Sequence, residues 1–215
     1  MRLDSFLVSS GDLGSRGRAK RAITEGHVKV NGRVIFKPSY DVAYSDNIEM
    51  NEDLDKPAGY WKLKNIQVKT KFMKKGDIVL DVGSSAGGFL MLASEIAAHV
   101  HGIEFSHEFH SVLQKVEQDY KNVTVEFGDI FSLPQSTGKY DVLLLDITVS
   151  PLSSIKALEI LLPALKSGGK LLHVLKLSKA TEIRPLLPEI SSLGLDILNI
   201  MEPEKKEIYL IARKL

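Results

Sequence analysis

The chain has 215 residues, of which 44% are hydrophobic and 26% charged, with a net charge of +1 and no cysteine. This length can build one full α/β domain and a small second domain, and the absence of cysteine excludes disulfides and thiolate zinc sites. No apolar run approaches the roughly 20 residues of a membrane span, and residues 1–21 lack the apolar core of a secretion signal. We therefore expect a cytoplasmic protein.

The charge is distributed unevenly along the chain. Residues 1–37 contain eight lysine or arginine residues and three acidic residues, a net charge of +5 that the rest of the chain balances. Such an asymmetry favours contact between this end of the chain and a polyanion.

Two short helices and a hairpin are predicted in this basic segment. Leu3, Phe6 and Leu7 have the spacing of one helix face, and residues 15–26 (SRGRAKRAITEG) predict a second helix. Residues 27–36 (HVKVNGRVIF) alternate in polarity around an Asn-Gly pair, which is typical of a two-residue hairpin turn.

The order of these pieces resembles the S4 RNA-binding domain across residues 1–50. The family pattern R-L-D, S-R-x-x-A, G-x-V-x-V-N-G, K-P and D-x-I is matched in order by Arg2-Leu3-Asp4, Ser15-Arg16, Gly26 to Gly32, Lys37-Pro38 and Asp46-Asn47-Ile48. The resemblance implies a binder of structured RNA, whose phosphates would be contacted by cations. The expected contacts are Arg2, Arg16, Arg18, Lys20, Arg21 and Arg33. The alternative is a small helical cap with a solvated charged face.

A linker and a second domain are predicted to follow. Residues 51–59 (NEDLDKPAG) are polar and acidic and end in Pro-Ala-Gly, which indicates a linker before a domain of residues 60–215. From residue 77 onward, strand-like and helix-like runs alternate, which favours a largely parallel sheet with helices on both faces. The last two strand-like runs are joined only by EPEKK, so they should pair antiparallel.

The turn LDVGSSAGGF (residues 80–89) carries three glycines that let backbone approach a ligand closely, although it lacks the G-x-G-x-x-G fingerprint. Acidic residues are predicted at the ends of successive strands: Asp81, Glu104 and Asp129. Together these features resemble the S-adenosylmethionine site of class I methyltransferases.

That resemblance implies that Asp81 and Gly83 contact the methionine end of the cofactor, Glu104 its ribose and Asp129 its adenine. For Asp129, an ordinary acid at the end of a strand is the competing reading. The full set expected to bind S-adenosylmethionine is Asp81, Gly83, Ser84, Ser85, Gly87, Gly88, Phe89, Glu104, Asp129 and Asp146.

Four further residues occupy the ends of predicted elements, in YWKLKNIQ, YDVLLLDI, GGKLLHVLKL and KKEIYLIA. Their order resembles the Lys-Asp-Lys-Glu catalytic set of FtsJ-type 2′-O-ribose methyltransferases, carried here by Lys62, Asp146, Lys176 and Glu207. Taken singly, each has an ordinary reading: the lysines could be solvated, and Glu207 could pair with a neighbouring lysine.

The chemistry implied by this resemblance needs no metal. A ribose 2′-hydroxyl is a poor nucleophile until it loses its proton or its oxygen is polarised. Lys176 is expected to contact that oxygen, either as a base or as a stabiliser of the developing alkoxide. Two carboxylates would raise the pKa of Lys176, whereas burial and Lys62 would lower it, so the sequence leaves both roles open.

An S4 domain in front of this fold resembles the TlyA family, whose members carry both hemolysin and ribosomal RNA 2′-O-methyltransferase names. The resemblance implies a class I (Rossmann-like) methyltransferase sheet with an antiparallel last strand, preceded by a small α+β S4 domain. The expected activity is 2′-O-methylation of RNA, with ribosomal RNA as the substrate.

Several other functions were weighed. An RNA-binding ribosome-assembly factor with little or no methyltransferase activity is the main alternative. A membrane-active hemolysin would need an insertion segment, and a base methyltransferase would need an Asn/Asp-Pro-Pro-Tyr-like turn or a reactive cysteine; neither is found. HEFH (residues 107–110) has histidines three apart with no third ligand, which favours a helix surface over a zinc site.

Overall fold

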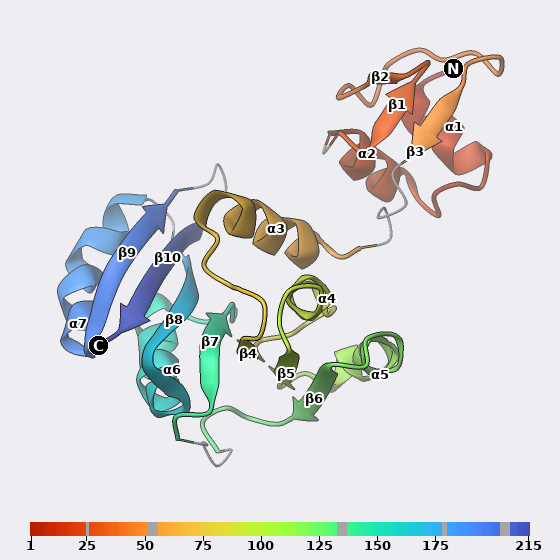
Figure 1. Ribbon diagram of the computed structural model, residues 1–215. Coiled ribbons are helices and arrows are strands. Elements are labelled where there is room, and N and C mark those ends of the chain that lie inside the picture. The colour runs from red at the N-terminus through yellow and green to blue at the C-terminus, as the bar shows by residue number, and fades with distance from the viewer. Residues whose placement is uncertain (25, 51–55, 133–136, 178–179, 203–206) are drawn as a thin grey trace. The chain divides into compact units, whose positions relative to one another are not determined.

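The computed structural model describes residues 1–24, 26–50, 56–132, 137–177, 180–202 and 207–215. These residues form two compact units, Met1–Lys56 and Pro57–Leu215 (Figure 1). The first unit has one hydrophobic core, and the second has two, one on each face of its sheet. No helix in the described ranges combines the length and the apolar character required to cross a bilayer.

The first unit packs two helices on a small antiparallel sheet. Its elements are α1 (Leu3–Ser9), α2 (Arg16–Thr24), β1 (Val28–Val30), β2 (Arg33–Val34) and β3 (Ile48–Met50), with strand order β2-β1-β3. The predicted helix faces are buried, because Leu3, Leu7, Ala19, Ala22 and Ile23 all belong to the core.

The predicted hairpin of the first unit is confirmed. Asn31 and Gly32 both have positive φ, at 51° and 78°, as the two central residues of a type I′ turn require. The Asn31 side chain donates to a carboxylate oxygen of Asp46 at 2.9 Å and accepts from the Asn47 N–H at 2.9 Å. These hydrogen bonds therefore fix the turn to the residues that directly precede β3.

The second unit is a mixed sheet covered by helices on both faces. Its helices are α3 (Ala58–Thr70), α4 (Gly88–Ser94), α5 (His110–Asp119), α6 (Pro151–Leu161) and α7 (Leu187–Ser192). Its strands are β4 (Ile78–Val82), β5 (His99–Glu104), β6 (Val123–Phe127), β7 (Tyr140–Leu145), β8 (Leu165–Lys176), β9 (Leu195–Met201) and β10 (Glu207–Lys214).

The strands described are arranged in the order β6-β5-β4-β7-β8-β10-β9. Neighbours from β6 to β8 run parallel, whereas β10 is antiparallel to both β8 and β9. The antiparallel pairing predicted for the last two strands is confirmed. The class I methyltransferase sheet expected from the sequence is present, with β10 inserted between β8 and β9.

Helices α3, α4 and α5 cover one face of the sheet, and α6 and α7 cover the other (Figure 1). Strand β7 contributes to the cores on both faces of the sheet. Val142 and Leu144 belong to the core under α3, α4 and α5, whereas Leu143 and Leu145 belong to the core under α6 and α7. A central strand buried on both faces explains the uninterrupted apolar run that the sequence shows there.

Two predicted boundaries differ from the structure. Helix α3 already contains Ala58 and Gly59, which the sequence analysis assigned to the linker; the earlier part of that linker, residues 51–55, lies outside the described residues. Pro57 is the N-cap, with an extended backbone at φ −61° and ψ 159°. Proline suits a helix start because its missing N–H would have no partner there.

Residues 154–169 (SIKALEILLPALKSGG) are one of the helix-like runs of the sequence, but the helix they form is shorter than this run. Helix α6 ends at Leu161, two residues before Pro163, and β8 begins at Leu165. Strand β8 therefore includes Gly168, whose φ is +73°, and its pairing with β7 is irregular in this region. Lys166, Gly168 and Gly169, at the end of the helix-like run, lie instead in an irregular extended segment.

Gly88, in the predicted cofactor turn, allows a close contact between α4 and α3. A Cβ at this position would lie 2.5 Å from the Tyr60 main-chain nitrogen and 2.9 Å from main-chain atoms of Gly59. These are backbone atoms, so the two helices would have to separate to accept a side chain.

We expect Gly88→Ala to lower the free energy of unfolding by roughly 2 kcal/mol or more, because it overpacks a backbone contact. Chemical denaturation checks this. Gly17→Ala is the matched control: Gly17 lies within α2, only a Ser15 hydroxyl at 3.9 Å lies near its added Cβ, and alanine favours the helix. A Gly88→Ala variant as stable as the Gly17→Ala variant would contradict the close packing.

Candidate active site

Four charged side chains meet at one edge of the sheet in the second unit. Lys62 comes from α3, Asp146 follows β7, Lys176 ends β8 and Glu207 begins β10. Lys62 Nζ lies 2.8 Å from Asp146 Oδ2 and 3.0 Å from Glu207 Oε2. Lys176 Nζ lies 2.6 Å from Asp146 Oδ1 and 2.8 Å from Glu207 Oε1. We call this closed set of alternating charges the four-charge ring.

The sheet topology explains why these residues meet. Because β10 runs antiparallel to β8, the first residue of β10, Glu207, pairs in register with the last residue of β8, Lys176. Asp146 follows the end of β7, which is parallel to β8. Asp146, Lys176 and Glu207 thus lie at strand ends on the same edge of the sheet, whereas Lys62 reaches this edge from within α3, not from an element end.

The pKa shifts of Lys176 and Glu207 favour the charged states of these two residues. Burial lowers the pKa of Lys176, but the charges and hydrogen bonds of Asp146 and Glu207 outweigh it, so the pKa is raised above 10.5. Burial raises the pKa of Glu207, but hydrogen bonds from Lys176 and Lys62 bring it down to about 2. Lys176 therefore holds its proton at neutral pH. The ring side chains are only 16–27% exposed, so solvent screens them incompletely.

Two aromatic rings border Lys62. Its Nζ lies 6.0 Å from the centroid of Phe89 and 5.9 Å from that of Tyr209. The Tyr209 hydroxyl donates to Glu207 Oε2 at 3.2 Å. The sequence analysis missed Tyr209, although its spacing of two from Glu207 in a strand places both on one face of the sheet.

A cavity of about 650 Å³ lies beside the ring, at the carboxyl ends of the parallel strands. Five predicted residues line it: Gly83, Ser85, Glu104, Asp129 and Asp146. The sequence analysis did not identify the apolar part of the wall, which includes Ile103, Phe105, Phe109, Ile130, Phe131, Ile147 and Val149. The volume is ordinary for a small-molecule site. Asp146 belongs to both the cavity and the ring.

The predicted cofactor residues do not all line the cavity. Ser84 is buried and donates to the main-chain carbonyl of Asp81 at 3.3 Å. Gly87 approaches α5, where an added Cβ would lie 2.8 Å from the Val116 side chain, and Gly88 approaches α3. Phe89 is buried in the core beneath α3. Part of the glycine-rich pattern therefore reflects helix packing.

Gly83 is the glycine that the cavity itself requires. Its φ is +86°, and an added Cβ would lie 2.6 Å from the main-chain oxygen of Asp146. Any side chain here would push the β4 turn away from the residue that the cavity and the ring share.

Glu104 and Asp129 are held by main-chain donors. Glu104 Oε2 accepts from the Ser85 N–H at 2.7 Å, and Oε1 accepts from the Ser106 N–H at 2.8 Å. Asp129 Oδ1 accepts from the Phe131 N–H at 3.0 Å. Both carboxylates keep acceptor capacity toward the cavity, because each oxygen can accept more than one hydrogen bond.

Asp81 is the unusual group of the site. It is fully buried, and within the described residues both its carboxylate oxygens lack a hydrogen-bond partner. Burial, together with the charges of Asp146 and Glu104, raises its pKa to about 7. A buried carboxyl group without a partner fits a ligand that supplies positive charge or donors nearby. S-adenosylmethionine, with an ammonium and a sulfonium group, meets that requirement.

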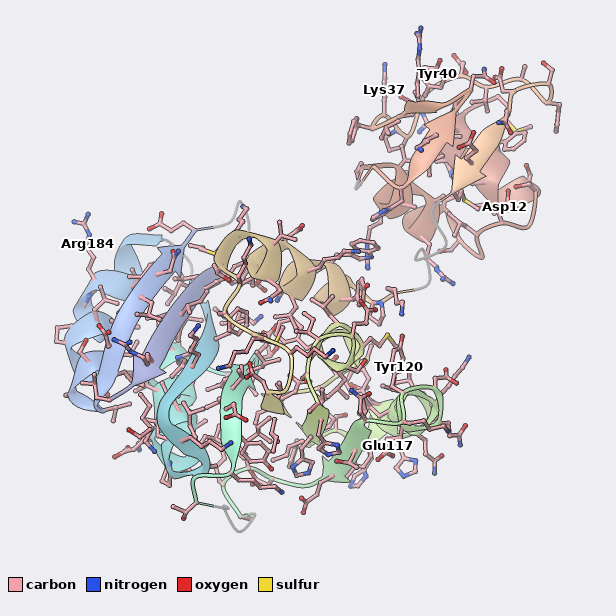
Figure 2. All side chains as sticks on the ribbon, in the orientation of Figure 1. Asp12, Lys37, Tyr40, Glu117, Tyr120 and Arg184 are labelled. Atoms are coloured by element: carbon pink, nitrogen blue, oxygen red, sulfur yellow. The ribbon has the colours of Figure 1, made fainter. Side chains whose placement is uncertain are left out.

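In the first unit, all six predicted RNA-contacting residues are exposed. Two of them also hold a buried acid: Arg2 Nε lies 3.0 Å from Asp4 Oδ1, and Arg16 Nη2 lies 3.2 Å from Asp4 Oδ2. These hydrogen bonds keep the pKa of Asp4 far below its usual range. Figure 2 shows Lys37 and Tyr40 projecting outward from the loop after β2. Asp4 was not singled out from the sequence as the anchor of Arg2 and Arg16.

His107 and His110 both pack against Phe127, at centroid distances of 5.9 and 4.9 Å. Across the part of the chain that the structure describes, no group of three or more potential metal ligands is found.

Comparison with known proteins identifies both units. The S4 domain model matches residues 1–48, and the FtsJ-like methyltransferase model matches residues 58–215. Hemolysin A of Brachyspira hyodysenteriae is 31% identical over 129 residues, covering 59% of this chain and 52% of that protein. Ribosomal RNA large subunit methyltransferase E of Syntrophobacter fumaroxidans is 30% identical over 183 residues, covering 72% and 87%.

The chain spans about half of Hemolysin A and about a third of other curated relatives that it matches. A solved structure from Streptococcus thermophilus, described as a candidate hemolysin, is 18% identical with a TM-score of 0.61 and covers 100% of this chain and 88% of that one. Fibrillarin of Aeropyrum pernix with S-adenosylmethionine bound is 17% identical with a TM-score of 0.58, covering 79% and 80%. At these identities, the likeness shows the fold alone.

The raised pKa of Asp81 predicts a pH-dependent gain from Asp81→Asn. Because the folded pKa of about 7 lies above the ordinary value of 3.8, the protonated carboxyl is favoured in the fold. The contribution of the protonated Asp81 carboxyl to the free energy of unfolding is fully present below about pH 4, and it is lost as the pH rises through 7. Asparagine stays neutral, so at pH 8 we expect the variant to gain on the order of 2 kcal/mol in the free energy of unfolding, and little at pH 4.

Denaturation at the two pH values checks this expectation. Asp77→Asn is the control, because Asp77 is also buried but accepts from the Lys74 N–H at 2.8 Å, and it should give no gain at pH 8. An Asp81→Asn effect that is equal at pH 4 and pH 8 would show that Asp81 is paired in solution.

Proposed function

Because the chain belongs to the FtsJ-like methyltransferase family, we propose that it transfers the methyl group of S-adenosylmethionine to a ribose 2′-hydroxyl of RNA. The observation that carries the proposal is the four-charge ring beside a cofactor-sized cavity, with Asp146 shared by both. A hydroxyl placed at the ring would face a methyl donor in the cavity.

In this proposal S-adenosylmethionine occupies the cavity. Gly83 would face its methionine end, with the carboxyl group of Asp81 buried behind the cavity wall, while Glu104 would face its ribose and Asp129 its adenine. Bound there, the cofactor supplies a methyl group already activated by the sulfonium charge. Much of the rate would then come from holding donor and acceptor in line.

Lys176 acts in this proposal as an electrostatic stabiliser. Its raised pKa keeps it an ammonium at neutral pH, so it can donate to the 2′-oxygen and stabilise the negative charge that develops there. Glu207, with a pKa lowered to about 2, is a weak base. The hydroxyl proton would pass to Asp146, the ring carboxylate that also borders the cavity, as the methyl group bonds to the oxygen.

The proposed substrate is ribosomal RNA, bound in part by the first unit. Support comes from the S4 domain match, from the exposed arginines of that unit and from relatives named ribosomal RNA methyltransferases and small ribosomal subunit protein uS4. The competing function is a ribosome-assembly factor that binds the same RNA without methylating it.

The defining experiment incubates the protein with methyl-labelled S-adenosylmethionine and unmodified ribosomal RNA, both free and assembled into subunits. Digestion to nucleosides then locates the label. We expect it on a ribose 2′-oxygen. Label on a base would remove the role given to the ring, and binding of cofactor and RNA without any label would favour the assembly factor.

Substitution of Lys176 separates its two possible roles. Lys176→Ala should lower the single-turnover rate about 10²- to 10³-fold, as removal of a donor to a developing oxyanion does elsewhere. Lys176→Arg should keep substantially more of the rate, because arginine stays charged and cannot act as a base. Cofactor affinity, measured by calorimetry, should stay near wild type in both.

Lys170→Ala, on the same strand and outside the ring, is the control and should keep the wild-type rate. If Lys176→Arg is as inactive as Lys176→Ala, while cofactor binding is intact, a neutral lysine base becomes the better account.

A further inference from the structure

Helix α3 and the loop after it carry an unbalanced positive charge. Residues 57–76 contain six lysines and no acidic residue. The lysines are Lys62, Lys64, Lys69, Lys71, Lys74 and Lys75. Elsewhere in this unit acids and bases are interspersed, so this stretch produces a local positive field that the near-neutral net charge conceals.

The helix geometry directs part of this charge toward the four-charge ring. The buried side of α3 is formed by Tyr60, Leu63 and Ile66. At about 100° per residue, Lys69 lies within about 20° of Lys62 around the helix axis and two turns, roughly 10 Å, further along it. Lys69 is therefore on the side of the helix that Lys62 uses to reach the ring.

The charge continues past the end of the helix. Lys71 is the C-cap, in the left-handed region at φ 48°, and it is exposed, as are Lys69 and Lys75. Within the described ranges, none of these three lysines has an acidic group within ion-pair distance, whereas Lys62 is held by two. We call Lys69, Lys71 and Lys75 the lysine track.

We propose that the lysine track binds the phosphates of the RNA strand that flanks the target nucleotide. This inference rests on the proposed function, because it places the strand next to the ring where the 2′-hydroxyl reacts. Lysine side chains on a helix and its cap neutralise phosphates without reading sequence, so they set position rather than base identity. Holding the strand beside the reacting ribose limits its motion relative to the methyl donor.

RNA fits this surface better than an anionic membrane. A helix that lies on a lipid surface buries an apolar face among the acyl chains. The apolar side of α3 is already occupied, because Tyr60, Leu63 and Ile66 belong to the core of the unit. The track begins roughly 10 Å along α3 from Lys62, a distance that a few nucleotides of the substrate strand can span.

The test is a triple variant of the full chain, Lys69→Gln, Lys71→Gln and Lys75→Gln. Glutamine is close to lysine in helix propensity, so the fold should be kept while three charges are removed. The matched control is Lys115→Gln, Lys121→Gln and Lys156→Gln, which removes three exposed lysines from elsewhere in the unit. Dissociation constants for unmodified ribosomal RNA are measured as a function of salt concentration for wild type and both variants.

We expect the track variant to bind this RNA about tenfold to a hundredfold more weakly, and the slope of log K against log salt to fall in magnitude by about 2. S-adenosylmethionine affinity should not change, and the control should match wild type in both respects. An unchanged slope for the track variant, or an equal loss in the control, overturns the inference.

The outcomes also separate this inference from the proposed function. A wild type that methylates the 2′-oxygen, with a track variant of unchanged RNA affinity, overturns the track alone. If the wild type binds RNA through the track but transfers no methyl group, the proposed methyltransferase activity is wrong and the track stands. Vesicles containing phosphatidylserine provide the last comparison: loss of vesicle binding in the track variant, with RNA binding intact, overturns the inference in favour of a membrane surface.

Discussion

The geometry of the four-charge ring depends on the position and direction of β10 in the sheet of the second unit. A strand inserted antiparallel between β8 and β9 begins where β8 ends, so a carboxylate at its first residue faces the last lysine of its neighbour. That single pairing supplies two corners of the ring, and the turn after β7 supplies a third. Lys62, from outside the sheet, closes the ring against two carboxylates that would otherwise repel each other at short distance.

The ring also determines the chemistry available to its members. Each ammonium is shared by two carboxylates, so the interior of the site is nearly neutral although it holds four charges. Each lysine ammonium has three N–H donors and the ring uses two of them, so under the proposed function one donor remains for an incoming hydroxyl. Such a site is preorganised, because its charges are oriented before the substrate arrives. Removing one member would leave an unpaired, partly buried charge on its neighbours.

The sequence predicted the architecture well and the details of packing less well. The resemblance to the FtsJ-type catalytic set indicated that Lys62, Asp146, Lys176 and Glu207 would meet, and the structure places each lysine nitrogen within 3.0 Å of both carboxylates. The roles of the individual glycines could not be predicted from the sequence. A turn that lies close to a ligand and a helix that lies close to another helix both require a residue without a side chain. The lysines of α3 and the loop after it do not stand out in the sequence, because acids elsewhere in the chain balance them to a net charge of +1.

The contact between Gly59 and Gly88 gives the site a mechanical property. Gly88 begins α4 directly after the cofactor turn, and Gly59 lies one turn of α3 before Lys62. Backbone meets backbone there, with no side chain between them to absorb a displacement. If the cofactor turn shifts when the cavity fills, α3 would therefore move with it as a rigid body. Lys62, which lies on α3, would move as well. In the proposed reaction, the residues that hold the methyl donor and the lysine that faces the acceptor would share one stiff support.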